Sequence, residues 1–210
     1  MDSVITNWEN WIVGIFSSAI PMGVAILWGY AKLWRPYSKF QKMGVVKIFT
    51  NQKEAEQCIV EECQNSKKLR VFAMRGETFS DEENSTIAKE VQQRAKLKQL
   101  YLISSANDNE YLSQRAKLLE DPDLIDGVKK SISCLTRASK DHSNIELKLH
   151  KEDVRFRIIL LDNYLFLSVI EDKRAKQTEI LKISKNSSFY KTYSKIFDEL
   201  WEKYPIVKTI

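Results

Sequence analysis

The pattern of apolar and polar positions divides the chain into an uncharged run near the N-terminus and a longer alternating part. Residues 10–31, NWIVGIFSSAIPMGVAILWGYA, carry no charge, and from Trp11 to Ala31 they are mostly apolar. At about 1.5 Å rise per residue, a helix of this length spans about 30 Å, the thickness of the hydrocarbon core of a bilayer. The sequence therefore predicts a transmembrane helix within residues 1–34.

The flanks of this run indicate its orientation. Aromatic residues, which prefer the headgroup interface, lie at both ends of the run: Trp8, Trp11, Trp28, Tyr30 and Trp34. Basic residues, which stay on the cytoplasmic side, lie after it: Lys32, Arg35, Lys39 and Lys42. Because the basic residues all follow the run, we expect a single-pass protein of the inner (plasma) membrane with its N-terminus outside and its C-terminal domain cytosolic. A cleaved signal peptide is the alternative, but signal peptides begin with positive charge, whereas Asp2 and Glu9 precede this run.

Small residues recur at four-residue intervals in the predicted span, where they form the pairs Gly14 and Ser18, Ala19 and Gly23, and Ala25 and Gly29. Such pairs let membrane helices approach closely, so they favour a homo-oligomer that associates through the span. The alternative is that small residues are simply common in membrane helices.

The rest of the chain alternates between strand and helix patterns. A basic linker over residues 35–44 leads into a predicted domain over residues 45–210. Strands are expected at 45–50, 69–74, 97–104, 145–150, 155–161, 164–170 and 178–183, and helices at 51–66, 84–97, 109–120, 123–141 and 186–204. Asp162 and Asn163 predict a hairpin turn. The order indicates an α/β fold class, a layered domain with a mixed sheet flanked by helices.

Composition narrows the chemistry of this domain. The net charge of +5 suits an anionic partner such as phosphate, nucleic acid or lipid headgroups. Three cysteines without a C-x-x-C pair argue against disulfides, and two histidines are too few for a His-rich metal site, so no metal and no cofactor are predicted. The run from Lys173 to Lys195 holds seven basic residues and one acid, which indicates either a solvated surface or a face toward nucleic acid or the inner leaflet.

One predicted strand begins with an unusual pair of cations. In DVRFRIILLDN, residues 153–163, Arg155 and Arg157 point to the same side of the strand, and Asp162 closes it. The spacing resembles the H-x-K-x4-D signature of phospholipase D-like domains, with the two arginines in place of the His and the Lys. Residues 69–79, 101–116 and 197–201 also resemble pieces of that family. The resemblance covers about residues 45–205 and implies one half-domain of the phospholipase D-like fold.

The resemblance also implies a degenerate site. In the family the His is the nucleophile and the Lys steadies the phosphate charge, whereas a guanidinium stays protonated and cannot attack phosphorus. Val169 and Ile170 stand where the family has Gly-Ser, and its active sites need two signatures. What remains is an anion-binding arrangement of Arg155, Arg157 and Asp162 without catalytic residues.

Two alternatives stay open at this strand. In the first, the arginines pair with the neighbouring acids Glu152, Asp153 or Glu146 at a solvated strand end and bind no ligand. His150 is the remaining candidate for a nucleophile, although a surface histidine is the simpler interpretation.

Three functions follow from these patterns. The first is a membrane-anchored, non-catalytic effector or binding module. It resembles effectors of prokaryotic defence systems in which a sensor activates the cytosolic part and oligomers damage the membrane. Its partners would be the lipid bilayer, a second copy, a protein sensor or activator, and an anionic lipid or nucleic acid. The alternatives are a membrane-tethered phosphodiesterase, as a phospholipase or nuclease, and a membrane-tethered nucleic-acid binder.

Overall fold

Strands and helices alternate along the unit that begins at Met43. The computed structural model describes residues 40–81, 85–169 and 179–207. The strands are β1 (Val45–Phe49), β2 (Lys68–Ala73), β3 (Lys98–Ser104), β4 (Ile145–His150), β5 (Phe156–Leu160), β6 (Tyr164–Val169) and β7 (Ile180–Ser184). The helices are α2 (Gln52–Gln64), α3 (Glu77–Ser80), α4 (Thr86–Gln92), α5 (Glu110–Leu118), α6 (Leu124–Asp141) and α7 (Ser188–Lys203).

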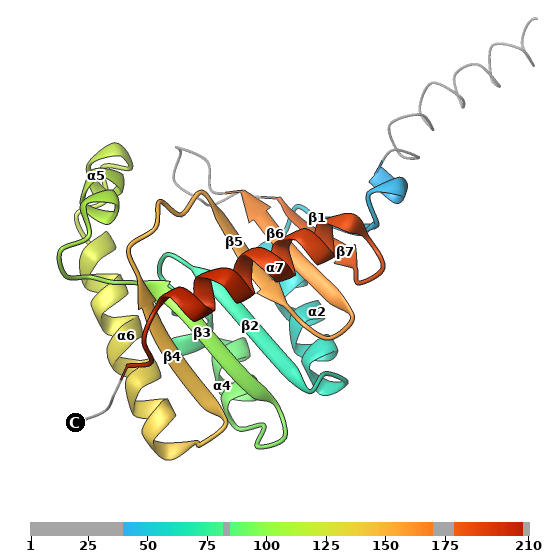
Figure 1. Cartoon of the computed structure of the whole chain (residues 1–210), viewed down its shortest axis with the longest axis horizontal. Coiled ribbons are helices and arrows are strands. Elements are labelled where there is room, and N and C mark those ends of the chain that lie inside the picture. Colours follow the sequence, from blue (N-terminus) through green and yellow to red (C-terminus); the bar gives the residue numbers. More distant parts are fainter. Residues whose placement is uncertain (1–39, 82–84, 170–178, 208–210) are drawn as a thin grey trace, which may run out of the picture. The chain divides into compact units, whose positions relative to one another are not determined.

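The strands form one mixed sheet with the order β1-β7-β6-β5-β2-β3-β4 (Figure 1). β2, β3 and β4 are parallel to one another, and the other neighbouring pairs are antiparallel. Leu160 pairs with Leu165 across the turn at Asp162 and Asn163, so the predicted hairpin of β5 and β6 is confirmed. The sheet therefore joins a parallel half to an antiparallel half at the β2–β5 pair.

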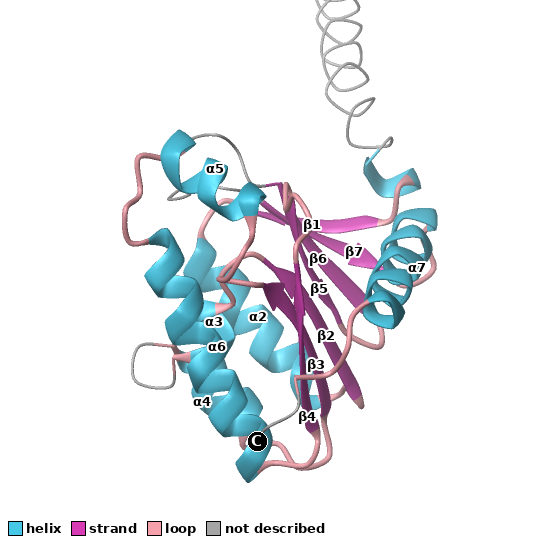
Figure 2. Ribbon diagram, turned by 60° about the vertical axis from the view of Figure 1, so that its left-hand side comes forward, coloured by secondary structure: helices cyan, strands magenta, loops and turns pink. Residues whose placement is uncertain are grey.

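Two apolar layers cover the sheet (Figure 2). Helices α2, α3, α4 and α6 pack on one face through residues such as Ile59, Phe79 and Leu135. Helix α7 packs on the other face through Tyr190 and Phe197, with Trp201 beside them. Successive strand residues face opposite layers because side chains alternate with a period of two. In β5, Ile158 and Leu160 contact the α7 layer, and Ile159 contacts the α2 layer.

Polar residues begin several of these helices. The side chains of Asn51, Ser85, Asn109 and Ser187 each accept a hydrogen bond from a backbone N–H in the first turn of α2, α4, α5 and α7, respectively. Such caps satisfy donors that have no partner within the helix. The starts of these helices are thus readable from the sequence to within two residues.

The prediction of a membrane-spanning fold is corrected. Over residues 40–81, 85–169 and 179–207, no helix combines the length and the apolar character needed to cross a bilayer. The longest helix described, α6, is amphipathic: it buries Leu124, Val128 and Leu135, and carries lysines on its exposed side. The fold class supported is a mixed α/β domain, in place of a transmembrane helix joined to a phospholipase D-like domain. The predicted location in the inner membrane is corrected with it.

The residues of the predicted span lie outside the described part of the chain. This holds for the small residues from Gly14 to Gly29 and for the interface residues from Trp8 to Lys39. Lys42 is the one predicted interface residue within the described part, and it is exposed.

Candidate functional site

The carboxyl ends of three strands meet at one edge of the sheet, which we call the carboxyl edge. β2, β3 and β4 are parallel and all end there. β5 runs antiparallel to β2, with Ile158 opposite Phe72, so the start of β5 lies at the same edge. Arg155 and Arg157 are therefore placed at the carboxyl edge, together with His150 at the end of β4.

Arg157 lies half-buried near the start of β5, on the face of the sheet covered by α2, and pairs with Ser168 of β6. In the part of the chain that the structure describes, its guanidinium makes no hydrogen bond and no ion pair. Burial lowers the pKa of Arg157, and the negative charge of Glu56 on α2 opposes that shift from beyond ion-pair distance. Among the described residues, no carboxylate lies within ion-pair distance to balance this positive charge.

Arg155 precedes β5 and is more exposed. Its Nε lies 2.8 Å from Oδ2 of Asp153, and its side chain is 76% exposed. Of the neighbouring acids proposed as strand-end partners, Glu152 pairs with Lys203 and Glu146 pairs with Lys98. The strand-end interpretation thus describes Arg155 and not Arg157.

Asp162 lies at the opposite end of β5 from the two arginines. The backbone N–H of Lys67 donates to its Oδ2 over 2.7 Å. This contact ties the β5–β6 turn to the start of β2. The structure consequently brings Arg155 and Arg157 to one edge of the sheet and leaves Asp162 at the other.

His150 is fully buried at the end of β4. Its Nδ1 accepts the backbone N–H of Glu152 over 3.1 Å, and its Nε2 lies 3.3 Å from the carbonyl oxygen of Ala73. The acceptor role of Nδ1 assigns the proton to Nε2, which donates to Ala73. Burial lowers the pKa of His150 to about 4. Both ring nitrogens are engaged in a neutral ring, so this side chain lacks a free lone pair for attack on phosphorus.

A polar cluster that the sequence pattern did not reveal lies beside His150. Glu152 Oε1 accepts hydrogen bonds from Lys203 Nζ and from the Tyr204 hydroxyl, both over 2.6 Å. These hydrogen bonds lower the pKa of Glu152. The contact joins the β4–β5 segment to the end of α7 across about fifty residues of sequence. A pattern within either segment therefore cannot predict it.

The basic run of residues 173–195 is divided by the fold. Lys182 turns toward the α2 layer, where its Nζ lies 2.6 Å from Glu62 and 4.1 Å from the centre of the Tyr164 ring. Lys185, Lys191 and Lys195 lie instead along one groove beside α7. Residues 173–176 lie outside the described part of the chain.

No group of three or more His, Cys, Asp or Glu residues within the described ranges is arranged to hold a metal ion. Cys58, Cys63 and Cys134 are free thiols. Burial raises the pKa of Cys63 to about 12, which keeps this thiol protonated and unreactive.

The comparisons with known proteins do not assign a family. No family model and no curated protein matches the chain. A solved structure of TrmBL2, an archaeal chromatin protein that binds DNA, is similar with a TM-score of 0.47 and 16% identity, over 95% of this chain and 67% of that chain. Similarity at this level indicates neither a shared family nor a shared function, and the phospholipase D-like resemblance stays a prediction.

Proposed function

We propose that this domain is a non-catalytic binding module that recognises a phosphate or phosphodiester group at the carboxyl edge, with Arg157 as its principal contact. The observation that carries the proposal is the half-buried Arg157 guanidinium, which has no hydrogen-bond or ion-pair partner among the described residues. Moving an ionised side chain out of water without a partner destabilises the folded state by several kilocalories per mole, or shifts the pKa of the side chain toward the neutral form.

An anionic group would supply what Arg157 lacks. A guanidinium presents five N–H donors in a planar fork that matches two oxygens of a phosphate. Arg155 lies two residues away on the same side and is more exposed, so a bound anion can draw it from Asp153. The bound phosphate would also reverse the lowered pKa of Arg157, because an opposite charge favours the protonated form.

The chemistry at the edge favours binding over cleavage. In the resemblance to the phospholipase D-like signature, Arg155 stands in the place of the nucleophilic histidine and Arg157 in the place of the lysine. Neither guanidinium can attack phosphorus. His150, the other candidate, is neutral and uses both nitrogens in hydrogen bonds. Such a module acts through what it binds: ligand occupancy changes its association with a protein partner or a second copy, as in a signalling or effector component.

The test compares Arg157→Gln with Arg137→Gln, which removes the same charge from an exposed position on α6. Thermal unfolding is followed at constant ionic strength with inorganic phosphate and with dimethyl phosphate. At ten times its dissociation constant, a ligand stabilises the folded state by about 1.4 kcal/mol, which raises the midpoint by about 3 °C in a domain of this size.

We expect wild type and Arg137→Gln to show this rise and Arg157→Gln to lose it. Without phosphate, Arg157→Gln should be at least as stable as wild type, because it removes a charge that has no ion-pair partner among the described residues. The proposal fails if phosphate leaves the wild-type midpoint unchanged, or if Arg157→Gln retains the full rise. Hydrolysis of a phosphodiester that is lost in His150→Ala would instead indicate an enzyme.

A further inference from the structure

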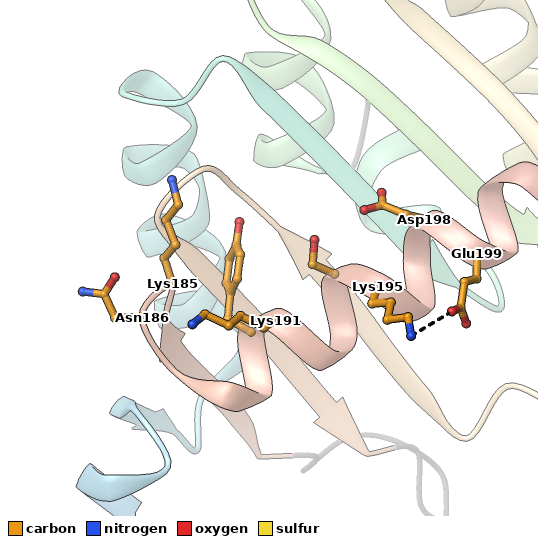
Figure 3. Close-up of a pocket in the computed structure, with 8 residues that line it drawn as sticks. Lys185, Asn186, Lys191, Lys195, Asp198 and Glu199 are labelled. Atoms are coloured by element: carbon orange, nitrogen blue, oxygen red, sulfur yellow. Dashed lines mark ion pairs between the residues drawn. The ribbon is translucent and has the colours of Figure 1, made fainter.

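A groove of about 530 Å³ runs beside α7 (Figure 3). Three lysines and Asn186 line it toward the start of the helix, and two acids line it toward the end: Lys185, Lys191 and Lys195, then Asp198 and Glu199. The groove lies outside the carboxyl edge and is not part of the site around Arg157.

Contacts of α7 and of the turn that precedes it place the groove at the opposite edge of the sheet. The Tyr190 hydroxyl donates to the carbonyl oxygen of Leu161 over 2.7 Å, and the backbone N–H of Lys185 donates to the carbonyl oxygen of Asn163 over 2.9 Å. Both acceptors belong to the β5–β6 turn, at the far end of β5 from Arg157. A ligand in the groove would therefore not touch the carboxyl edge.

The charges of the groove are unevenly compensated. Asp198 is engaged by Arg70 over 3.0 Å, and Glu199 lies 3.6 Å from Lys195. The ammonium groups of Lys185 and Lys191 form no ion pair with any residue that the structure describes. The first turn of α7 contains no acidic residue. The start of the groove thus keeps an excess of positive charge that faces solvent.

We propose that this groove binds the phosphodiester backbone of a nucleic acid, with Lys185, Lys191 and Lys195 against successive phosphates. Lys191 and Lys195 are about 6 Å apart along the helix axis, at 1.5 Å rise per residue. Cations spaced along a helix fit a chain of phosphates better than one compact anion. Flexible lysine stems contact phosphates as point charges without reading bases. The Tyr190 ring is buried, so it offers no platform for stacking, and binding is independent of base sequence.

The experiment measures fluorescence anisotropy of labelled single-stranded and duplex DNA with the full chain, at salt concentrations from about 25 to about 200 mM. The groove variant is Lys185→Glu with Lys191→Glu. The matched control is Lys89→Glu with Lys96→Glu, which makes the same change in net charge at exposed positions in and after α4. Circular dichroism checks that both variants fold.

We expect the groove variant to bind either probe at least tenfold more weakly, with the slope of log affinity against log salt reduced by about two, while the control stays within about threefold of wild type. The groove variant should keep the phosphate-dependent rise in melting temperature that is assigned to Arg157, which separates this groove from the carboxyl edge. Equal weakening by the groove variant and the control, or no binding by wild type at low salt, would overturn the proposal. Displacement of DNA by inorganic pyrophosphate at equal phosphate concentration would also overturn it, in favour of a small phosphate compound.

Discussion

Arg70 of β2 and Asp198 of α7 form an ion pair across the layer between sheet and helix, with Nη1 3.0 Å from Oδ1. The same Nη1 lies 2.9 Å from the Ser194 hydroxyl, and the guanidinium lies 5.8 Å from the centre of the Phe197 ring. The Arg70 side chain is 12% exposed, whereas that of Asp198 is 58% exposed. The Arg70 guanidinium, on the sheet side of this layer, therefore holds α7 against the sheet.

The first prediction concerns this pair. Asp198→Ala should lower the free energy of unfolding by about 1–2 kcal/mol, because it leaves a largely buried guanidinium without its counter-charge and with only the hydroxyls of Ser194 and Tyr190 beside it. Glu199→Ala is the matched control on the next residue, where the exposed pair with Lys195 is worth roughly 0.5 kcal/mol or less. Urea unfolding measures both values. Equal losses in the two variants would contradict a special role of the Arg70 pair.

The second prediction is a loss of stability between pH 6.5 and about 4. Burial lowers the pKa of His150 from 6.5 to about 4, so the unfolded chain takes up a proton in this interval and the folded chain does not. The contribution of His150 to the free energy of unfolding is fully present above pH 6.5 and decreases as the pH falls below that value. The loss approaches about 3 kcal/mol at the lower end, at about 1.4 kcal/mol for each pH unit.

Urea unfolding between pH 5 and pH 7 measures this slope largely above the titration of the carboxylates. His150→Gln should flatten the slope and also cost stability at pH 7, since the ring holds Ala73 and Glu152. His142→Gln reports how much of the slope comes from the other histidine. A slope that is unchanged in His150→Gln would show that His150 is not the group responsible.

The third prediction concerns Gly44, which precedes β1. Its φ of +80° lies in the left-handed region, and an added Cβ would overlap Cβ of Ser187. Ser187 caps α7 by accepting the N–H of Tyr190 over 3.0 Å. Gly44→Ala should therefore cost at least about 2 kcal/mol, from backbone strain and the displaced cap together.

A second substitution separates these two costs. Ser187→Gly removes the overlapping Cβ. Glycine at the N-cap position of a helix lowers the stability by only roughly a few tenths of a kilocalorie per mole relative to serine. The double variant should then be more stable than Gly44→Ala alone in urea unfolding. If the double variant is less stable by the sum of both losses, the two residues do not contact as described.

The elements of the sheet could be predicted from the sequence because their signals are local. Apolar runs in β3 and β5 and capping residues such as Asn109 and Ser187 lie within the segments they define. The missed helix, α3, has only four residues and lacks a side-chain cap at Gly76, so it produces no periodic pattern. The buried face of α7 is harder to read from spacing, because two aromatic residues are adjacent there: Phe189 is 37% exposed, whereas Tyr190 is buried.

The site could not be predicted to the same degree because its contacts join distant segments. Spacing alone grouped Asp162 with Arg155 and Arg157, although a strand places its two ends at opposite edges of a sheet. Likewise, the charge of Lys182 suggested an outward face, whereas pairing of β7 with β6 turns this residue onto Glu62. Register and layer decide which charges meet, and neither is encoded in a short stretch of residues.

The last prediction tests whether Asp162 belongs to the fold or to the site. Its Oδ2 accepts the backbone N–H of Lys67 over 2.7 Å and ties the β5–β6 turn to the start of β2. Asp162→Ala should lower the free energy of unfolding by about 1–2 kcal/mol, because the N–H loses its acceptor, while Asp162→Asn keeps a carbonyl oxygen there and should recover about half of that loss. Neither change should alter the phosphate-dependent rise in melting temperature, since the arginines lie at the other end of β5. If Asp162→Ala abolished that rise in a folded protein, Asp162 would act in anion binding, and the separation of the two ends of the strand would not describe the site.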